Sequence, residues 1–200
     1  MIFLLVIFAL GLVIILSVLY YQRAQRMKFK ARFDNFFNLV ETLKKALVMV
    51  QMHRGFTTTY LNGDHVHKEA IDDMKALSDK LWLQLSSEHT ALVDDPLFIG
   101  LLNHWERLKV RWVNQTVVNN IEQHNRLILN FLCLIDNQVE ENSLFFPREG
   151  IKGIATLWRL LLETVESIAQ IQTISIGMIR AKKSKGLDRI KMNSLIERTK

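Results

Sequence analysis

The chain begins with an unbroken apolar stretch, residues 1–21, in which no side chain carries a charge. Most of these residues are Leu, Ile, Val or Phe. An α-helix rises about 1.5 Å per residue, so this stretch is long enough to span the roughly 30 Å hydrocarbon core of a bilayer. Tyr20 and Tyr21 end the stretch, where aromatic residues anchor a helix at the membrane interface. The pattern predicts one N-terminal transmembrane anchor.

A cleaved secretory signal is the competing interpretation of the same stretch. Such a signal carries basic residues before its apolar run and small residues at the cleavage site after it. Here the basic residues follow the apolar run, and residues 18–21 (VLYY) make a poor cleavage site. We therefore favour an uncleaved anchor.

From residue 33 onward, apolar side chains recur at the three- and four-residue spacing of helices that bury one face. In the first such stretch, 33–61, they are Phe33, Phe36, Phe37, Val40, Leu43, Leu47 and Val50. Similar stretches predict further helices near 66–89, 97–113, 117–135, 154–179 and 187–196. The first domain helix is expected to continue from the anchor with little break.

Turn-forming residues separate these stretches. Gly63 can take the left-handed conformation that ends a helix, and Asp64 can cap the next one. Asp95 followed by Pro96 predicts a turn and a helix start, since proline suits the first helical turn. The clearest loop is 142–153, which contains a proline and two glycines.

Together these patterns predict an all-α protein in which the transmembrane anchor precedes an antiparallel (up-and-down) bundle of about five to six helices. The chain has only eight glycines and two prolines in 200 residues, too few for the many turns of an all-β fold. We expect three parts: the anchor at 1–21, a basic juxtamembrane segment at 22–32 and a helical domain at 33–200.

The juxtamembrane segment 22–32 holds five Lys or Arg and no acid, whereas no charged side chain precedes the anchor. The positive-inside rule then places the N-terminus outside and the domain in the cytoplasm, at a plasma membrane such as the bacterial inner membrane. Nucleic-acid binding is the alternative explanation of these charges and of the net charge of +6. No aromatic platform or recognition helix accompanies them, so we favour contact with anionic lipid and expect no nucleic-acid partner.

Motifs for catalysis or cofactor binding are missing from the sequence. It has no glycine-rich phosphate loop and no Gly-x-Ser-x-Gly elbow, so we expect neither an enzyme nor a cofactor. His65 and His67 flank one residue and cannot share a helix face, so we expect surface histidines and no metal site. Cys133, the single cysteine, lies in an apolar helix and is expected to be a buried thiol in a reducing compartment.

One predicted helix does contain an unusual polar stripe. Gln51, Arg54 and Thr58 stand at i, i+3 and i+7 between apolar turns. Gly55, which costs about 1 kcal/mol relative to alanine inside a helix, suggests close approach by another helix or a ligand. An arginine directed at a bundle core needs an anion or carboxylate.

Two interpretations of Arg54 remain open. Its side chain either pairs with Glu163 or Glu166 across the bundle, or it binds a ligand. The residues alone slightly favour the pairing with a glutamate. The two glutamates are three residues apart on one helix face. No Glu-x-x-His motif accompanies them, so a solvated helix edge is a better expectation for them than a di-metal centre.

Residues 51–55 (QMHRG), followed by Tyr60 and Leu61, resemble the Gln-x-Glu-Arg-Gly…Leu signature of nitrate- and nitrite-sensing (NIT) domains. The likeness continues at 124–135, similar to the family's Tyr-Thr-x-Leu-Ile helix, and at 161–172, similar to its late helix with Glu166 on the family glutamate. Residues 186–196 resemble the segment that follows. The resemblance implies an all-helical sensor domain from about residue 33 to the C-terminus.

The resemblance also implies a ligand site and partners. In the family, arginines of these helices hold the small anion; here the late arginine is Gln172 and the late glycine is Ala169, so of that set Arg54 remains. We expect a ligand site at Arg54, Gln51, Thr58 and Gln172 that binds a small anion such as nitrate or nitrite. We expect signalling through a separate partner protein, because no output module is present, and a homodimer by analogy. A membrane scaffold that binds no ligand is the alternative function.

Overall fold

The computed structural model describes residues 2–143, 159–160, 163–171, 173–175, 178 and 186–198. Within these ranges, the side chains of residues 2, 4–6, 9, 143, 187–188 and 198 are not described. All regular secondary structure in the described part of the chain is helical, which confirms the all-α class. The predicted loop at 142–153 lies outside the described residues after residue 143.

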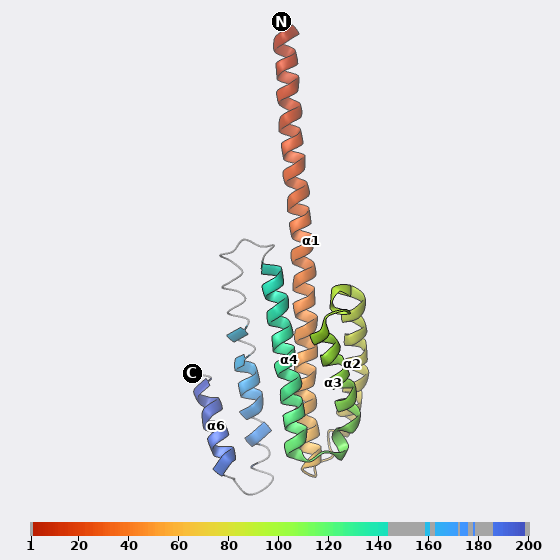
Figure 1. Cartoon of the computed structure of the whole chain (residues 1–200), viewed down its shortest axis with the longest axis vertical. Coiled ribbons are helices and arrows are strands. Elements are labelled where there is room, and N and C mark those ends of the chain that lie inside the picture. Colours follow the sequence, from red (N-terminus) through yellow and green to blue (C-terminus); the bar gives the residue numbers. More distant parts are fainter. Residues whose placement is uncertain are drawn as a thin grey trace. The chain divides into compact units, whose positions relative to one another are not determined.

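The helices with defined bounds are α1 (Ile2–Leu61), α2 (Lys68–Glu88), α3 (Pro96–Arg111), α4 (Val117–Ser143) and α6 (Gly186–Arg198), as Figure 1 shows. Two short 3₁₀ turns, η1 (Thr90–Leu92) and η2 (Trp112–Asn114), follow α2 and α3. Residues 163–171 and 173–175 are also helical, and we call them the Glu166 segment. The predicted helix at 154–179 is thus seen in part, and what remains of it lies outside the described residues.

The chain divides into two compact units, Met1–Leu39 and Val40–Lys200. The first unit consists of α1 up to Leu39, and apolar side chains along it are exposed, including Phe3, Phe8, Ile14 and Leu19. Among the residues that the structure describes, no helix combines the length and the apolar character needed to cross a membrane.

The second unit contains the hydrophobic core. Trp82 of α2 packs against Phe98 of α3 and Phe131 of α4, with ring centroids 5.8 and 5.5 Å apart. Trp105 of α3 is fully buried beside these helices. The end of α1 runs antiparallel to α4, because His53 contacts His124 while the later Thr57 contacts the earlier Asn120. This antiparallel pair positions the polar site described below.

Two of the predicted turn and capping residues are confirmed, and one prediction is wrong. Gly63 has the predicted positive φ, 93°, directly after α1, and Asp95 caps α3 by accepting from the backbone N–H groups of Leu97 and Phe98. Asp64, however, does not cap α2: its carboxylate accepts from the N–H of Val66, and α2 begins only at Lys68. The turn after α1 is longer than expected, so Asp64 stabilises the turn rather than the helix end.

The expectation that Cys133 is a buried thiol is wrong, because its side chain is exposed. The buried face of α4 carries Phe131, Leu134 and Ile135, and position 133 falls with the exposed Leu129 on the opposite side. The apolar neighbours of Cys133 in the sequence therefore belong to a different face of the helix.

Candidate ligand site around Arg54

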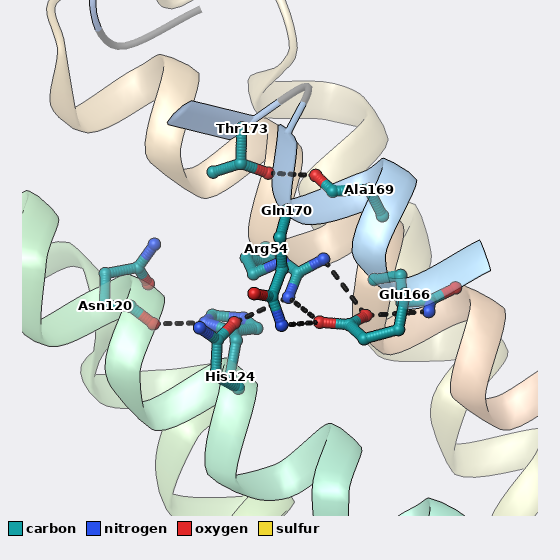
Figure 2. A network of polar contacts seen from close by, with 9 residues as sticks. Arg54, Asn120, His124, Glu166, Ala169, Gln170 and Thr173 are labelled. Atoms are coloured by element: carbon teal, nitrogen blue, oxygen red, sulfur yellow. Dashed lines mark hydrogen bonds and ion pairs between the residues drawn. The ribbon is translucent and has the colours of Figure 1, made fainter. Parts of the chain in front are cut away.

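A buried ion pair lies at the centre of the site. Arg54 of α1 donates from Nη1 to Oε1 of Glu166 at 2.6 Å and from Nη2 to Oε2 at 3.3 Å. The side chains are 1% and 7% exposed. Figure 2 shows this pair joining α1 to the Glu166 segment. Little water reaches either charge, so each depends on the other and on further hydrogen bonds for solvation.

Neighbouring amides add further hydrogen bonds to the pair. Nη1 of Arg54 also donates to Oδ1 of Asn125 on α4 at 2.6 Å. Glu166 accepts from Nε2 of Gln170 at 2.6 Å and from Nε2 of Gln51 at 2.9 Å. Arg54 thus contacts α4 and the Glu166 segment with one nitrogen. Its Nε atom is buried without a hydrogen-bond partner among the described residues.

Two buried histidines lie beside Arg54. Nδ1 of His124 is 2.7 Å from the backbone oxygen of Asn120, so it carries the proton and donates. Nε2 of His124 must then accept, and Nδ1 of His53, 2.8 Å away, donates to it. This pattern fixes both tautomers and leaves Nε2 of His53 as a buried acceptor without a partner among the described residues.

Burial keeps both imidazoles neutral. It lowers the pKa of His53 to about 3, with a smaller contribution from the charge of Lys75. It holds the pKa of His124 well below the usual value, aided by His53 and Arg54. Trp105 packs edge-on against His53, with ring centroids 4.9 Å apart, and closes that side of the pair.

A second polar link lies one turn further along α1. Nδ2 of Asn120, which is fully buried, donates to Oγ1 of Thr57 at 3.0 Å and to Oγ1 of Thr58 at 3.2 Å. Thr57 in turn donates to the backbone oxygen of His53 at 2.6 Å. Thr58 therefore helps to align α1 with α4.

A cavity of about 470 Å³ reaches Arg54 from the side of α4, the Glu166 segment and α6. Arg54, Asn125, Gln170 and Thr173 form polar parts of its wall. Apolar side chains line other parts: Val118, Ile121, Ile174, Ile190 and Leu195. Its volume falls within the roughly 300–1,000 Å³ of small-molecule sites. Besides Arg54, the charged side chains of Glu122 and Lys191 line it, so its wall is polar and apolar in comparable parts.

The four predicted ligand residues do not all line the cavity. Arg54 lines the cavity, whereas Gln51 binds Glu166 and Thr58 binds Asn120 without lining it. Gln172 lies outside the described residues. The predicted pairing of Arg54 with a glutamate is confirmed for Glu166.

Two expectations about this region are wrong. Glu166 is buried, not part of a solvated edge, because Arg54 compensates its charge; Glu163 is exposed. The expected close approach of another helix to Gly55 is not found in the described part of the chain, since a Cβ atom built there would meet nothing within 4 Å.

Sequence reasoning missed Asn125, Gln170 and the contact between His53 and His124. One signal was available, because Gln170 follows Glu166 by four residues and so shares its helix face. His124 is packed in the core and hydrogen-bonded to a backbone oxygen of its own helix.

Within the described ranges, no group of three or more His, Cys, Asp or Glu side chains could hold a metal ion. Comparison with known proteins adds no further information: no family model, curated protein or solved structure matches this chain.

Proposed function

We propose that this protein is a membrane-tethered sensory domain that binds a small molecule in the cavity beside Arg54 and signals through a separate partner protein. One observation supports this proposal above the others: a cavity of small-molecule size reaches a buried arginine. The same arginine holds α1, α4 and the Glu166 segment together. A ligand that engages Arg54 therefore acts on the contacts that connect three helical elements.

The proposed response is an exchange of partners at Arg54. A ligand with an anionic or accepting group would compete with Asn125 and Glu166 for the Nη1 and Nη2 donors. Gln170, bound to Glu166 and also lining the cavity, would follow the carboxylate or donate to the ligand. A ligand shifts a conformational equilibrium only through its different affinity for the two states, and this exchange supplies that difference.

The ligand class follows from the charges and the space. Glu166 already offsets the charge of Arg54, so a simple anion such as nitrate or nitrite must displace the carboxylate to gain full use of the guanidinium. The cavity is also larger than such an ion needs, and part of its wall is apolar. We therefore favour a molecule with an anionic or accepting end and an apolar remainder, and nitrate and nitrite, implied by the NIT resemblance, are the first ligands to test.

The proposed tether is the uncharged stretch 1–21 with the basic segment 22–32 behind it. Exposed apolar side chains along α1 in this region, such as Phe8 and Ile14, favour contact with lipid. With the positive charge on the C-terminal side, the sensory domain would lie in the cytoplasm of a single-pass protein.

Thermal unfolding of the full-length protein in neutral detergent tests ligand binding, with nitrate and nitrite compared against chloride and then with larger carboxylates. A ligand specific for the folded state adds about 2.7 kcal/mol at a hundredfold excess over its Kd. Ser194 on α6 lines the cavity, whereas its exposed neighbour Asn193 does not. Ser194→Trp should fill the cavity and abolish the response, and the matched variant Asn193→Trp should keep it.

The alternative function is a membrane scaffold that binds no ligand. The Arg54–Glu166 pair favours it, because an arginine whose charge is already paired with a carboxylate needs no anionic ligand. A scaffold predicts no stabilisation of the wild-type protein by any ligand tested. An equal response of the Ser194→Trp and Asn193→Trp variants would likewise contradict binding in this cavity.

A further inference from the structure

Three arginines converge on a second pocket, which is separate from the Arg54 site. It lies between α3 and α4 and has a volume of about 580 Å³. His104, Arg107 and Arg111 line it from α3, and Gln123, Arg126 and Asn130 line it from α4. On each helix the spacing is i, i+3 and i+7, so each set forms one continuous face. We call this the arginine pocket.

The described residues provide no counter-charge for the arginine pocket. Its lining contains no carboxylate. Within the described ranges, none of Arg107, Arg111 and Arg126 forms an ion pair, although other cations on the same unit do. All three arginines are exposed at the rim of the pocket, where a dissolved ligand can reach them.

The nearest acids on the same helices face elsewhere. Glu106 binds Lys109, which also binds Asp79 of α2 at 2.6 Å. Glu122 of α4 lines the cavity beside Arg54 rather than the arginine pocket. The positive field is therefore concentrated in the pocket, and it acts on His104: after burial, Arg107 and Arg126 contribute to lowering the pKa of that imidazole.

We propose that the arginine pocket binds a phosphate group carrying two or more negative charges, as in pyrophosphate or a phosphate monoester. Guanidinium groups match phosphate oxygens with paired N–H donors, and three of them suit a multiply charged group better than a single carboxylate. The amides of Gln123 and Asn130 can donate to the remaining oxygens. Oε1 of Gln123 already contacts Nε2 of His104 at 3.0 Å, which joins the α3 and α4 sides of the pocket.

The phosphate could belong to a dissolved molecule or to a lipid headgroup, and the chemistry of recognition is the same. The experiment separates the two sources. Full-length protein in neutral detergent is titrated calorimetrically with inorganic pyrophosphate, and in parallel with micelles that contain a phosphatidic acid lipid. We expect binding in at least one arm.

Arg107→Ala/Arg111→Ala tests the site without changing buried residues. Its matched control is Lys80→Ala/Arg189→Ala, which removes the same charge from exposed positions outside the pocket. The pocket variant should bind at least about tenfold more weakly, because two charge-assisted contacts are lost, and the control should bind like the wild type. The pKa of His104, followed by NMR, should rise when phosphate binds, because the anion opposes the field of the arginines.

Binding of pyrophosphate that the pocket variant loses supports a dissolved phosphate compound as ligand. Binding of the lipid micelles alone, lost in the same variant, supports a lipid headgroup. The proposal is overturned if neither probe binds, or if the control weakens binding as much as the pocket variant. A His104 pKa that does not change when phosphate binds also overturns it, since the anion then lies elsewhere.

Discussion

Glu166 accepts hydrogen bonds from three side chains that come from two parts of the chain. Gln51 and Arg54 reach it from α1, and Gln170 reaches it from the next turn of its own helix. A buried carboxylate with this many donors is well solvated by the protein, but the same donors are left unsatisfied if it is removed. We therefore expect the pair to contribute more to the specificity of packing than to net stability.

The first prediction concerns the removal of one partner or both. Glu166→Ala should destabilise the protein by about 3–5 kcal/mol, because Arg54 is left buried without a counter-charge. The double variant Arg54→Met/Glu166→Leu should lose much less than the sum of the single losses. Chemical denaturation of Arg54→Met, Glu166→Leu and the double variant measures this coupling, and strictly additive losses would contradict the pairing.

The His53–His124 pair predicts a dependence of stability on pH. In the folded state both pKa values lie below the ordinary value of 6.5, and that of His53 is about 3. Below pH 6.5 the unfolded chain therefore binds protons that the folded chain does not. The free energy of unfolding should fall with decreasing pH, by up to about 1.4 kcal/mol per pH unit for each histidine.

Denaturant unfolding between pH 7 and 5.5 measures this slope above the range in which most carboxylates titrate. His65→Ala, which changes an exposed histidine, serves as the control and should keep the slope. NMR should show the imidazoles of His53 and His124 neutral at pH 5. Titration of both rings near 6.5 in the folded protein would refute the assignment.

At the level of elements, Gly55 is a weak point in α1. It lies inside the helix, where glycine loses more backbone entropy than alanine, and a Cβ atom there meets nothing. Gly55→Ala should raise the free energy of unfolding by about 0.5–1 kcal/mol. Thermal or chemical unfolding measures the gain. A loss of stability would show that another chain or a ligand approaches this position.

Helices α2, α3, α4 and α6 could be predicted from periodicity and helix-breaking residues because these signals are local. The spacing of apolar residues and the Asp95-Pro96 pair gave the start of α3. The position of Cys133 was predicted wrongly because its apolar neighbours conceal which face of α4 it occupies. Local patterns show that a helix has a buried face but define the edge of that face poorly.

At the scale of the whole molecule, the site depends on contacts that no local pattern contains. Arg54 and Glu166 are separated by 112 residues, and His53 and His124 by 71. The ion pair could be expected because a buried arginine needs a carboxylate. The histidine contact could not, because a neutral imidazole has many acceptable partners in a helical core.

Membrane orientation is a prediction at the same scale. A reporter fused after Lys200 should be active as a cytoplasmic enzyme and inactive as a periplasmic one, because the basic segment 22–32 follows the proposed anchor. Replacing the five basic residues of that segment with Gln should weaken or invert the preference. Periplasmic activity of the wild-type fusion would contradict the proposed orientation.

The sequence separations around Arg54 also imply an order of assembly. Contacts of α1 with α4 join residues 62–71 apart, whereas Glu166 reaches α1 across 112–115 residues. Because closing a shorter stretch of chain costs less entropy, we expect the Glu166 segment to dock on a surface that α1 and α4 have already formed. Its release should leave that pair intact. Amide hydrogens of 163–171 are therefore expected to exchange with deuterium before those of α4, and a ligand that slows their exchange would act on the last step of folding.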